Sequence, residues 1–461
     1  MPSRQDQLHS YQFTVQRAVA ALVTRETDPA VPPFRRLAGA ALASVLVAVI
    51  VLGGAALYGL FAGGGSGWRD ERAVVVEKES GARFVYRDGK LHPVSNYASA
   101  LLIIGAERAK TVLVSRRSIQ GVPRGLPLGI PDAPDSLPDA GRLTTAPWTV
   151  CSVTGPDATP PHSVLLVGAP ARDGRPLGDD AVLLRHPDGS LHLVWHRHRH
   201  RLRDANRVLA ALATTRQRAV PVAPALLDSL PAGPDLAPLD LPGLGEASDA
   251  VSGADIGDVH LVTNSGGGRQ YVVVDRDGVA GITELQASLL LARTGQGDPH
   301  PLTLGRFARL PKLPDLVPTG PTAPPTSPPR LARPEAGAIC GQAGDDGGVR
   351  EVRVGATVPE RGAVPRDGGP AGTGGVVADH VVVEPGRGAV VESVAAPGAT
   401  GGAVSVVTDL GRRHVVASTE VLGMLGYPDV RPVRLPAGLV SLVPAGPPLD
   451  PEAAREVVVP A

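Results

Sequence analysis

One uncharged apolar run, from Leu37 to Phe61, constrains this chain more than any other feature of its sequence. As a helix the run would reach roughly 37 Å at about 1.5 Å per residue, and the hydrocarbon core of a bilayer is about 30 Å thick. A buried helix of a soluble protein seldom reaches this length without a charge, and a signal peptide has a shorter apolar core after a shorter leader. The run is therefore predicted to be a single transmembrane helix.

The basic residues next to this run predict its orientation. Arg35 and Arg36 directly precede it, whereas residues 62–68 on the other side are uncharged. Basic residues close to a span are retained on the cytoplasmic side. We therefore predict a single-pass protein of the cell membrane, with residues 1–36 as a cytoplasmic amphipathic leader, 37–61 as the transmembrane helix and 62–461 as an extracytoplasmic domain.

The leader has the periodicity of an amphipathic helix. Ser3 and Asp6 form a candidate capping box at its start. Two roles remain open for its apolar face: a helix that lies on lipid, or a docking surface for a cytoplasmic partner. The apolar residues that recur at helical spacing are Leu8, Tyr11, Val15, Val19 and Leu22.

The only two cysteines, Cys151 and Cys340, both follow the apolar run. A pair on the extracytoplasmic side is what one structural disulfide needs. The alternative is two unrelated buried thiols. Metal ligation is disfavoured because no CxxC pair occurs.

Beyond the run, a hairpin followed by a short helix recurs four times. An Asp-Gly turn between β-rich segments is a strong hairpin signal. The predicted turns lie at 88–89, 188–189, 277–278 and 410–411, and the modules lie near 80–110, 180–215, 268–295 and 402–428.

Stiff Pro-rich linkers are predicted between these modules, over residues 127–138, 221–245 and 311–334. The turns are spaced too widely and unevenly for a stacked solenoid. The predicted fold class is therefore α+β: the cytoplasmic helix, the transmembrane helix, and an elongated extracytoplasmic domain of four hairpin-plus-helix modules around a β-rich central core.

The most distinctive polar segment is HLVWHRHRHRLR, residues 192–203. In a single strand His196, His198 and His200 would share one face, and the intervening arginines would share the other. A metal site, a pH-sensitive contact patch and a solvated strand edge remain open for this segment, so its role is left undecided.

No enzymatic site is predicted from the sequence. The chain contains no GxxxxGK[ST] phosphate loop, no GxSxG elbow and no HExxH helix. Its formal net charge is zero, which gives no global field for a nucleic acid. We therefore predict no catalytic, cofactor-binding or metal-binding residues and no cofactor.

Several spaced motifs, in order along nearly the whole chain, resemble the EccB family of actinobacterial type VII (ESX) secretion systems. They are the leader 7–23, HPVSNYASALLI at 92–103, PLGIPDAPDSLP at 127–138, WTVC at 148–151, VVVEPGRGAVVE at 381–392 and the C-terminal tract 425–454.

This resemblance implies a structural membrane subunit of a secretion complex, with a disulfide between Cys151 and Cys340. It also implies self-association and, as partners, the EccC translocase ATPase, the EccD and EccE membrane proteins and a mycosin protease. Some members of the family are labelled ATPases, so an ATP-hydrolysing subunit is the alternative function. The absence of a phosphate loop favours a protein that is not an enzyme. The segment 192–203 and the linker 311–334 match nothing in the family pattern.

Overall fold

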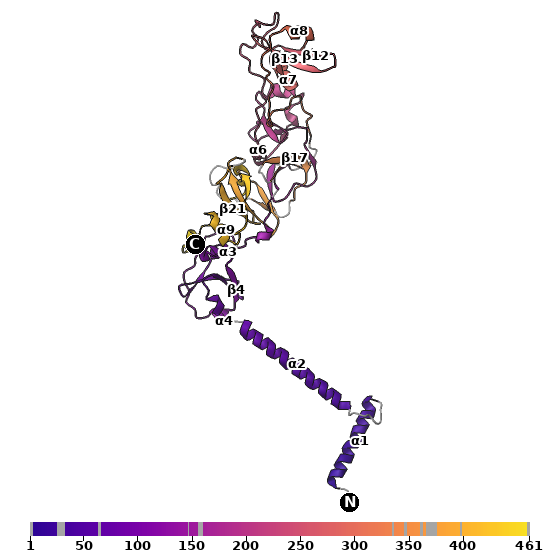
Figure 1. Ribbon diagram of the computed structural model, residues 1–461, viewed down its shortest axis with the longest axis vertical. Helices are drawn as coiled ribbons and strands as arrows, with labels where there is room; N and C mark the ends of the chain where they lie inside the picture. The colour runs from indigo at the N-terminus through magenta and orange to yellow at the C-terminus, as the bar shows by residue number, and fades with distance from the viewer. Residues whose placement is uncertain are drawn as a thin grey trace.

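The chain forms an elongated molecule with two helices at one end and five β-sheets along the remainder of its length (Figure 1). The structure is a computed structural model that describes residues 3–24, 33–62, 66–145, 147–154, 160–333, 336–344, 348–359, 363–365, 376–396 and 399–458. Short 3₁₀ helices occur at Ser66–Trp68, Ala140–Arg142 and Arg216–Arg218.

Two helices, α1 (Arg4–Thr24) and α2 (Pro33–Ala62), make up the N-terminal end. The predicted capping box is present, because Ser3 and Asp6 exchange hydrogen bonds between side chain and backbone. The backbone of α2 contains the whole apolar run, while the side chains of Leu37 and Phe61 lie outside the described residues. Judged by length and hydropathy, no helix in the described part of the chain qualifies as a membrane span.

Four of the sheets have four strands each and the same strand order. In each, three antiparallel strands are followed by a helix, and a fourth strand then pairs parallel with the first. A second short helix follows every fourth strand. The sequence predicted the hairpins and the first helices but missed the parallel fourth strands.

We name these units repeats 1 to 4. Repeat 1 has β1 (Ala73–Glu77), β2 (Arg83–Arg87), β3 (Lys90–Pro93), α3 (Tyr97–Ile104), β4 (Lys110–Val114) and α4 (Arg116–Ile119). Repeat 2 has β8 (Val182–Arg185), β9 (Leu191–Trp195), β10 (His198–Arg201), α5 (Ala205–Ala211), β11 (Val220–Pro221) and α6 (Pro224–Ser229). Repeat 3 has β12 (Val259–Thr263), β13 (Arg269–Val274), β14 (Val279–Ile282), α7 (Glu284–Thr294), β15 (His300–Leu302) and α8 (Leu304–Arg309). Repeat 4 has β20 (Ala389–Val394), β21 (Ala403–Val407), β22 (Arg413–Val415), α9 (Thr419–Met424), β23 (Val433–Pro436) and α10 (Ala437–Val440).

Local sequence signals explain where the longer repeat helices begin and end. The side chain of Asn96 accepts a hydrogen bond from the backbone of Ser99 at the start of α3, and Gly105 ends that helix in the left-handed conformation. Thr283 and Gln286 form a full capping box on α7.

In repeat 2 the predicted hairpin consists of different strands from the hairpins predicted in the other three repeats. Its Asp188-Gly189 turn joins the first two strands, whereas Asp88-Gly89 in repeat 1 joins the second and third. The true counterpart of Asp88-Gly89 is His196-Arg197, a two-residue turn in which both residues have positive φ. The third strand of repeat 2 is therefore β10, which follows the His196-Arg197 turn.

After its second helix, each repeat continues as an extended segment that pairs with its own third strand. The carbonyls of Pro123, Pro231, Pro311 and Pro444 accept hydrogen bonds from equivalent residues of β3, β10, β14 and β22. The Pro-rich tracts are thus partly edge strands of the repeats rather than free spacers. Proline has no N–H to donate, but at these positions it only accepts a hydrogen bond through its carbonyl, which an edge strand allows. Pro334, the last residue of the linker 311–334, lies outside the described residues.

The fifth sheet lies between the repeats and has the order β18-β19-β6-β5-β16-β17-β7. Its neighbouring strands β5 and β16 place Cys151 directly opposite Cys340, and the two are joined by a disulfide. Both cysteines are fully buried. The strands are β5 (Trp148–Val153), β6 (His162–Val167), β7 (Arg175–Pro176), β16 (Ala338–Ala343), β17 (Val349–Ala356), β18 (Ala363–Pro365) and β19 (His380–Val383).

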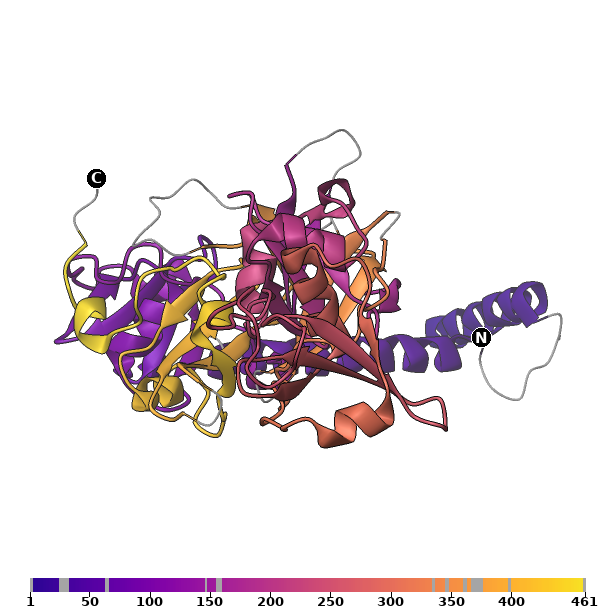
Figure 2. The same ribbon diagram turned by 90° about the horizontal axis from the view of Figure 1, so that it is seen from above.

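Shared hydrophobic cores fix the order of the units along the molecule. One core joins repeats 1 and 4, a second joins repeats 4 and 2 to the central sheet, and a third joins repeats 2 and 3. Repeats 1 and 4 therefore lie side by side although they are far apart in the sequence (Figure 2). The last helix, α11 (Pro451–Ala454), packs on α3 of repeat 1.

Candidate functional site

The predicted docking residues of the leader all lie on α1. Leu8, Tyr11, Val15 and Leu22 have exposed side chains, between 43% and 84% accessible, while Val19 is half-buried. Apolar side chains at this spacing lie along one stripe of a helix. The described part of α1 therefore presents an exposed apolar stripe.

Helix α2 exposes apolar side chains around its described portion. Eight of them are between 59% and 75% accessible, an exposure that is unfavourable in water for so many neighbouring aliphatic groups. They are Leu42, Val45, Leu46, Val47, Val49, Ile50, Val51 and Leu52.

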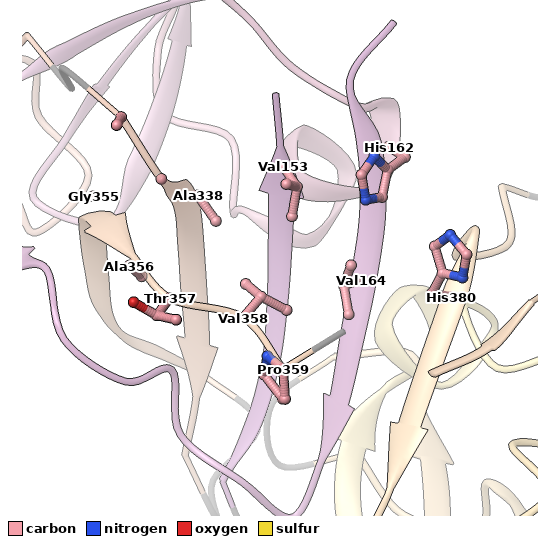
Figure 3. A pocket seen from close by; sticks show the side chains of 12 residues that line it. Val153, His162, Val164, Ala338, Gly355, Ala356, Thr357, Val358, Pro359 and His380 are labelled. Carbon is pink, nitrogen blue, oxygen red and sulfur yellow. The ribbon is translucent and has the colours of Figure 1, made fainter. Parts of the chain in front are cut away.

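A groove of about 580 Å³ opens over one face of the central sheet (Figure 3). Val153, Val164 and Val358 give it an apolar lining next to the cluster that contains the disulfide. His162 and His380 stand edge to face at its rim, with 5.4 Å between ring centroids. Among the described residues, the lining of this groove includes these two imidazoles and no carboxylate.

A histidine packs against a glycine of the extended segment in three of the repeats. A Cβ added at Gly125, Gly233 or Gly446 would lie 2.2–2.4 Å from the ring of His92, His200 or His414. Each of these rings also forms a hydrogen bond, through Nδ1, to the carbonyl oxygen of Leu126, Pro234 or Pro447. Burial lowers the pKa of His200 and His414, so these two rings are neutral structural groups.

The histidine and arginine segment forms a hairpin, so the single strand considered from the sequence was wrong. His196 lies at the exposed tip, where it stacks on Trp195 and contacts Asp179. His198 binds the backbone carbonyl of His196, and His200 points into the repeat. The three rings therefore do not converge on one point, and no group of three or more metal-ligating side chains occurs within the described residues.

The other face of this hairpin lines a pocket of about 330 Å³. We call it the arginine pocket and define it by His192, Arg199, Arg201, Asp228 and Asp235. Strands β9 and β10 place His192 directly opposite Arg201, with Arg199 on the same face. Helix α6 and the extended segment after it supply the two carboxylates. The sequence alternation correctly put these arginines on one face, but the contribution of His192 was missed because it comes from the neighbouring strand.

Burial lowers the pKa of His192 to about 4, and the positive charges of Arg199 and Arg201 act in the same direction. Its Nε2 lies 3.1 Å from the hydroxyl of Ser190, whereas its buried Nδ1 has no hydrogen-bond partner among the described residues. The ring is therefore uncharged at neutral pH, and only one of its two nitrogens has a hydrogen-bond partner in the described part of the chain.

Comparison with known proteins places this architecture in a family. The family model described as "Type VII secretion system ESX-1, transport TM domain B" matches residues 1–459. The chain belongs to this EccB family of type VII secretion proteins.

Curated relatives and solved structures agree with this assignment. The chain is 33% identical to the "ESX-5 secretion system ATPase EccB5" of Mycobacterium marinum over 66% of its own length and 61% of that protein, so it spans about three fifths of this relative. It is 30% identical to the "ESX-3 secretion system ATPase EccB3" of Mycolicibacterium smegmatis over 96% of its length and 88% of that protein.

Two solved structures resemble the fold closely. A chain of the intact ESX-5 inner membrane complex matches with a TM-score of 0.69 and 28% identity, covering 100% of this chain and 97% of that one. A chain of an EccB3 dimer from the ESX-3 core complex matches with a TM-score of 0.66 and 29% identity, covering 83% of this chain and 100% of that one.

Proposed function

We propose that the protein is a structural subunit of the membrane complex of a type VII secretion system. The observation that carries this proposal is the match of the full chain to a chain of the ESX-5 inner membrane complex. In this proposal no residue performs bond chemistry. The protein contributes a membrane anchor and an extended outer scaffold.

The proposed anchor is the apolar run 37–61 within α2, with the leader on the cytoplasmic side and residues 62–461 outside. The exposed aliphatic side chains of α2 support this proposal, because lipid or partner helices would remove them from water. The flanking Arg35 and Arg36 support the orientation.

The proposed partners are an EccC-type ATPase, EccD, EccE and a mycosin protease. The apolar stripe of α1 is the proposed contact for a cytoplasmic or membrane partner, because it is exposed in the isolated chain. Self-association is supported by the likeness to a chain of an EccB3 dimer.

The test is co-purification of the tagged full chain from its own membranes in mild detergent, followed by mass spectrometry. We expect an FtsK-like ATPase and a polytopic membrane protein to be recovered with it. Replacing Leu8 and Val15 by Gln should reduce their recovery severalfold. The matched control, Ser10→Gln on the opposite face of α1, should not. Recovery of the wild-type protein alone in good yield would contradict the proposal.

An ATP-hydrolysing subunit is the second candidate function, and only the names of the relatives, which include the word ATPase, favour it. The sequence has no phosphate loop of the GxxxxGK[ST] type. Metal-dependent ATP turnover that co-elutes with the purified full chain, and that persists after a second independent purification, would replace the structural proposal.

A further inference from the structure

The arginine pocket contains cationic groups that the fold does not require. Repeat 4 provides an internal comparison, because Arg199 and Arg413 occupy equivalent positions on β10 and β22. Both donate a hydrogen bond from Nε to a backbone carbonyl, Arg199 to Leu230 at 3.1 Å and Arg413 to Val443 at 3.0 Å. This contact is thus part of the shared scaffold of the repeats.

The pair next to this arginine differs between the two repeats. Where repeat 2 has His192 opposite Arg201, repeat 4 has Ser405 opposite Val415. The same strand geometry therefore forms without an imidazole or a second guanidinium. Packing alone does not explain the His192–Arg201 pair.

The charges around the pocket leave one cation without a partner. Arg203 is paired with Asp235 at 2.6 Å. Asp188 accepts a hydrogen bond from the backbone of Ser190, and its carboxylate lies 2.9 Å from Nδ1 of His186. Within the described residues the exposed Arg201 guanidinium has neither an ion pair nor a hydrogen bond, which leaves its five N–H donors available.

His192, next to Arg201, is a second side chain with a polar atom that has no hydrogen-bond partner in the described part of the chain. It is 94% buried by its accessible surface, yet its Nδ1 has no partner among the described residues. A buried polar atom without a partner is unfavourable unless a ligand or water satisfies it. An anion bound to Arg201 would lie beside this ring, because His192 stands directly opposite Arg201 on the neighbouring strand.

We propose that the arginine pocket of repeat 2 binds a small oxyanion group, held by Arg199 and Arg201 beside the ring of His192. The planar guanidinium fork fits the paired oxygens of a carboxylate or a phosphate. The pocket of about 330 Å³ exceeds the size of either group alone, so it accommodates an oxyanion that belongs to a somewhat larger molecule. Asp228, on the exposed side of α6, lines the same pocket and opposes binding of an anion.

The test uses the full chain in mild detergent and isothermal titration calorimetry. Sodium phosphate and sodium acetate are titrated separately at pH 7, with sodium chloride of equal ionic strength as the reference. Binding of phosphate alone would assign a phosphoryl group, and binding of acetate alone would assign a carboxylate. Binding of both would support the shared oxyanion chemistry.

Three variants connect any binding to this pocket. Arg201→Gln removes the unpaired cation, and we expect affinity to fall by about tenfold or more, as for a lost charge-assisted hydrogen bond. Arg197→Gln at the hairpin tip removes the same charge outside the pocket, and affinity should change less than about twofold because salt screens a charge at that distance. Asp228→Asn should strengthen binding.

The pH dependence provides a separate readout. The titratable and charged groups that surround His192 are His186, Asp188, Arg199, Arg201, Arg203, Asp228 and Asp235. An oxyanion beside His192 favours the protonated ring, so the affinity for acetate, which stays ionised over this range, should rise as pH falls from 7.5 to 6. Absence of binding by both oxyanions, or equal binding by the wild type and Arg201→Gln, would overturn the proposal.

Discussion

At the scale of single residues, the contact between histidine and glycine leaves no room for a larger side chain at the glycine position. Gly446 has ordinary backbone angles, so its role is to leave room for the ring of His414. Gly446→Ala should lower the free energy of unfolding by about 1–3 kcal/mol, as expected for overpacking. Urea denaturation followed by circular dichroism would measure this loss.

Two further variants isolate the steric cause. In Gly446→Ala combined with His414→Ala the clash is absent, so the double variant should be more stable than the sum of the two single losses predicts. Gly438→Ala, where nothing lies within 4 Å of the added Cβ, should be close to neutral. Strict additivity at Gly446 and His414 would show that the clash is not the cause.

Four buried histidines should make the folded state sensitive to acid. Burial lowers the pKa of His192, His200, His260 and His414 below the ordinary value near 6.5. Below that value the unfolded chain binds protons that the folded chain does not, so the free energy of unfolding falls as pH falls. For His192 the loss continues until about pH 4.

We therefore expect the urea midpoint to fall between pH 7.5 and pH 5. His414→Gln should make this decline shallower, because one of the groups that must remain neutral is gone. His9→Gln, on the exposed α1, should leave the decline unchanged. A midpoint that is constant or that rises toward pH 5 would contradict the assignment of neutral buried rings.

At the scale of secondary-structure elements, the disulfide joins two central strands that are distant in sequence. Cys151 on β5 and Cys340 on β16 are 189 residues apart. On the chain-entropy model a loop of this length contributes roughly 5 kcal/mol, and measured losses for native disulfides are about 2–5 kcal/mol. Replacing both cysteines by Ser should lower the urea midpoint by a corresponding amount.

The matched control for this prediction is the wild-type chain with and without reductant. Both sulfurs are buried, so reductant should have little effect until the chain unfolds. Under reducing denaturation the wild type should then approach the variant. If the two proteins had the same midpoint in the absence of reductant, the disulfide would not stabilise the folded state.

Elements with strong local signals were predictable from the sequence, and elements that depend on distant pairing were not. The caps at Asn96 and Thr283 and the Asp88-Gly89 turn depend on residues a few positions apart. The parallel strands β4, β11, β15 and β23 have two to five residues each and exist because they pair with a first strand far back in the chain.

The same distinction applies to the candidate sites. The His196-Arg197 turn lacks glycine, whereas Asp188-Gly189 gives a stronger turn signal. The sequence therefore assigned the hairpin of repeat 2 to the first two strands instead of the second and third. The sequence alternation put Arg199 and Arg201 on one face, and this is correct. The arginine pocket itself needs α6 and the segment that follows it, whose position depends on the core shared with the central sheet.

At the scale of the whole molecule, the repeats are joined in two pairs on either side of the central sheet. Helices α3 and α9 contact one another in the pair of repeats 1 and 4, and α5 and α7 do so in the pair of repeats 2 and 3. The paired helices bring each terminal repeat against an inner one. Each terminal repeat is therefore held to its neighbour in part by a contact between helices.

The contact between α5 and α7 can be weakened at one residue. Leu289 on α7 is 2% exposed and packs in the core that belongs mainly to repeat 2. Leu289→Ala should lower the free energy of unfolding by about 2–5 kcal/mol, as expected for the cavity left by a buried leucine. This cavity would open at the junction between repeats 2 and 3 rather than within either sheet. Hydrogen exchange should show lost protection in α5 and α7, while the central strands β5 and β16 keep theirs.

Leu290, which is also fully buried but packs in the core of repeat 3 itself, provides the matched control. Leu290→Ala should lower protection throughout β12, β13 and β14 rather than at the junction, because its neighbours belong to that sheet. Identical exchange patterns for the two variants would show that repeats 2 and 3 unfold as one unit. Different patterns would show that the outermost repeat is held to the scaffold by the helix contact, and that its position can be altered without unfolding it.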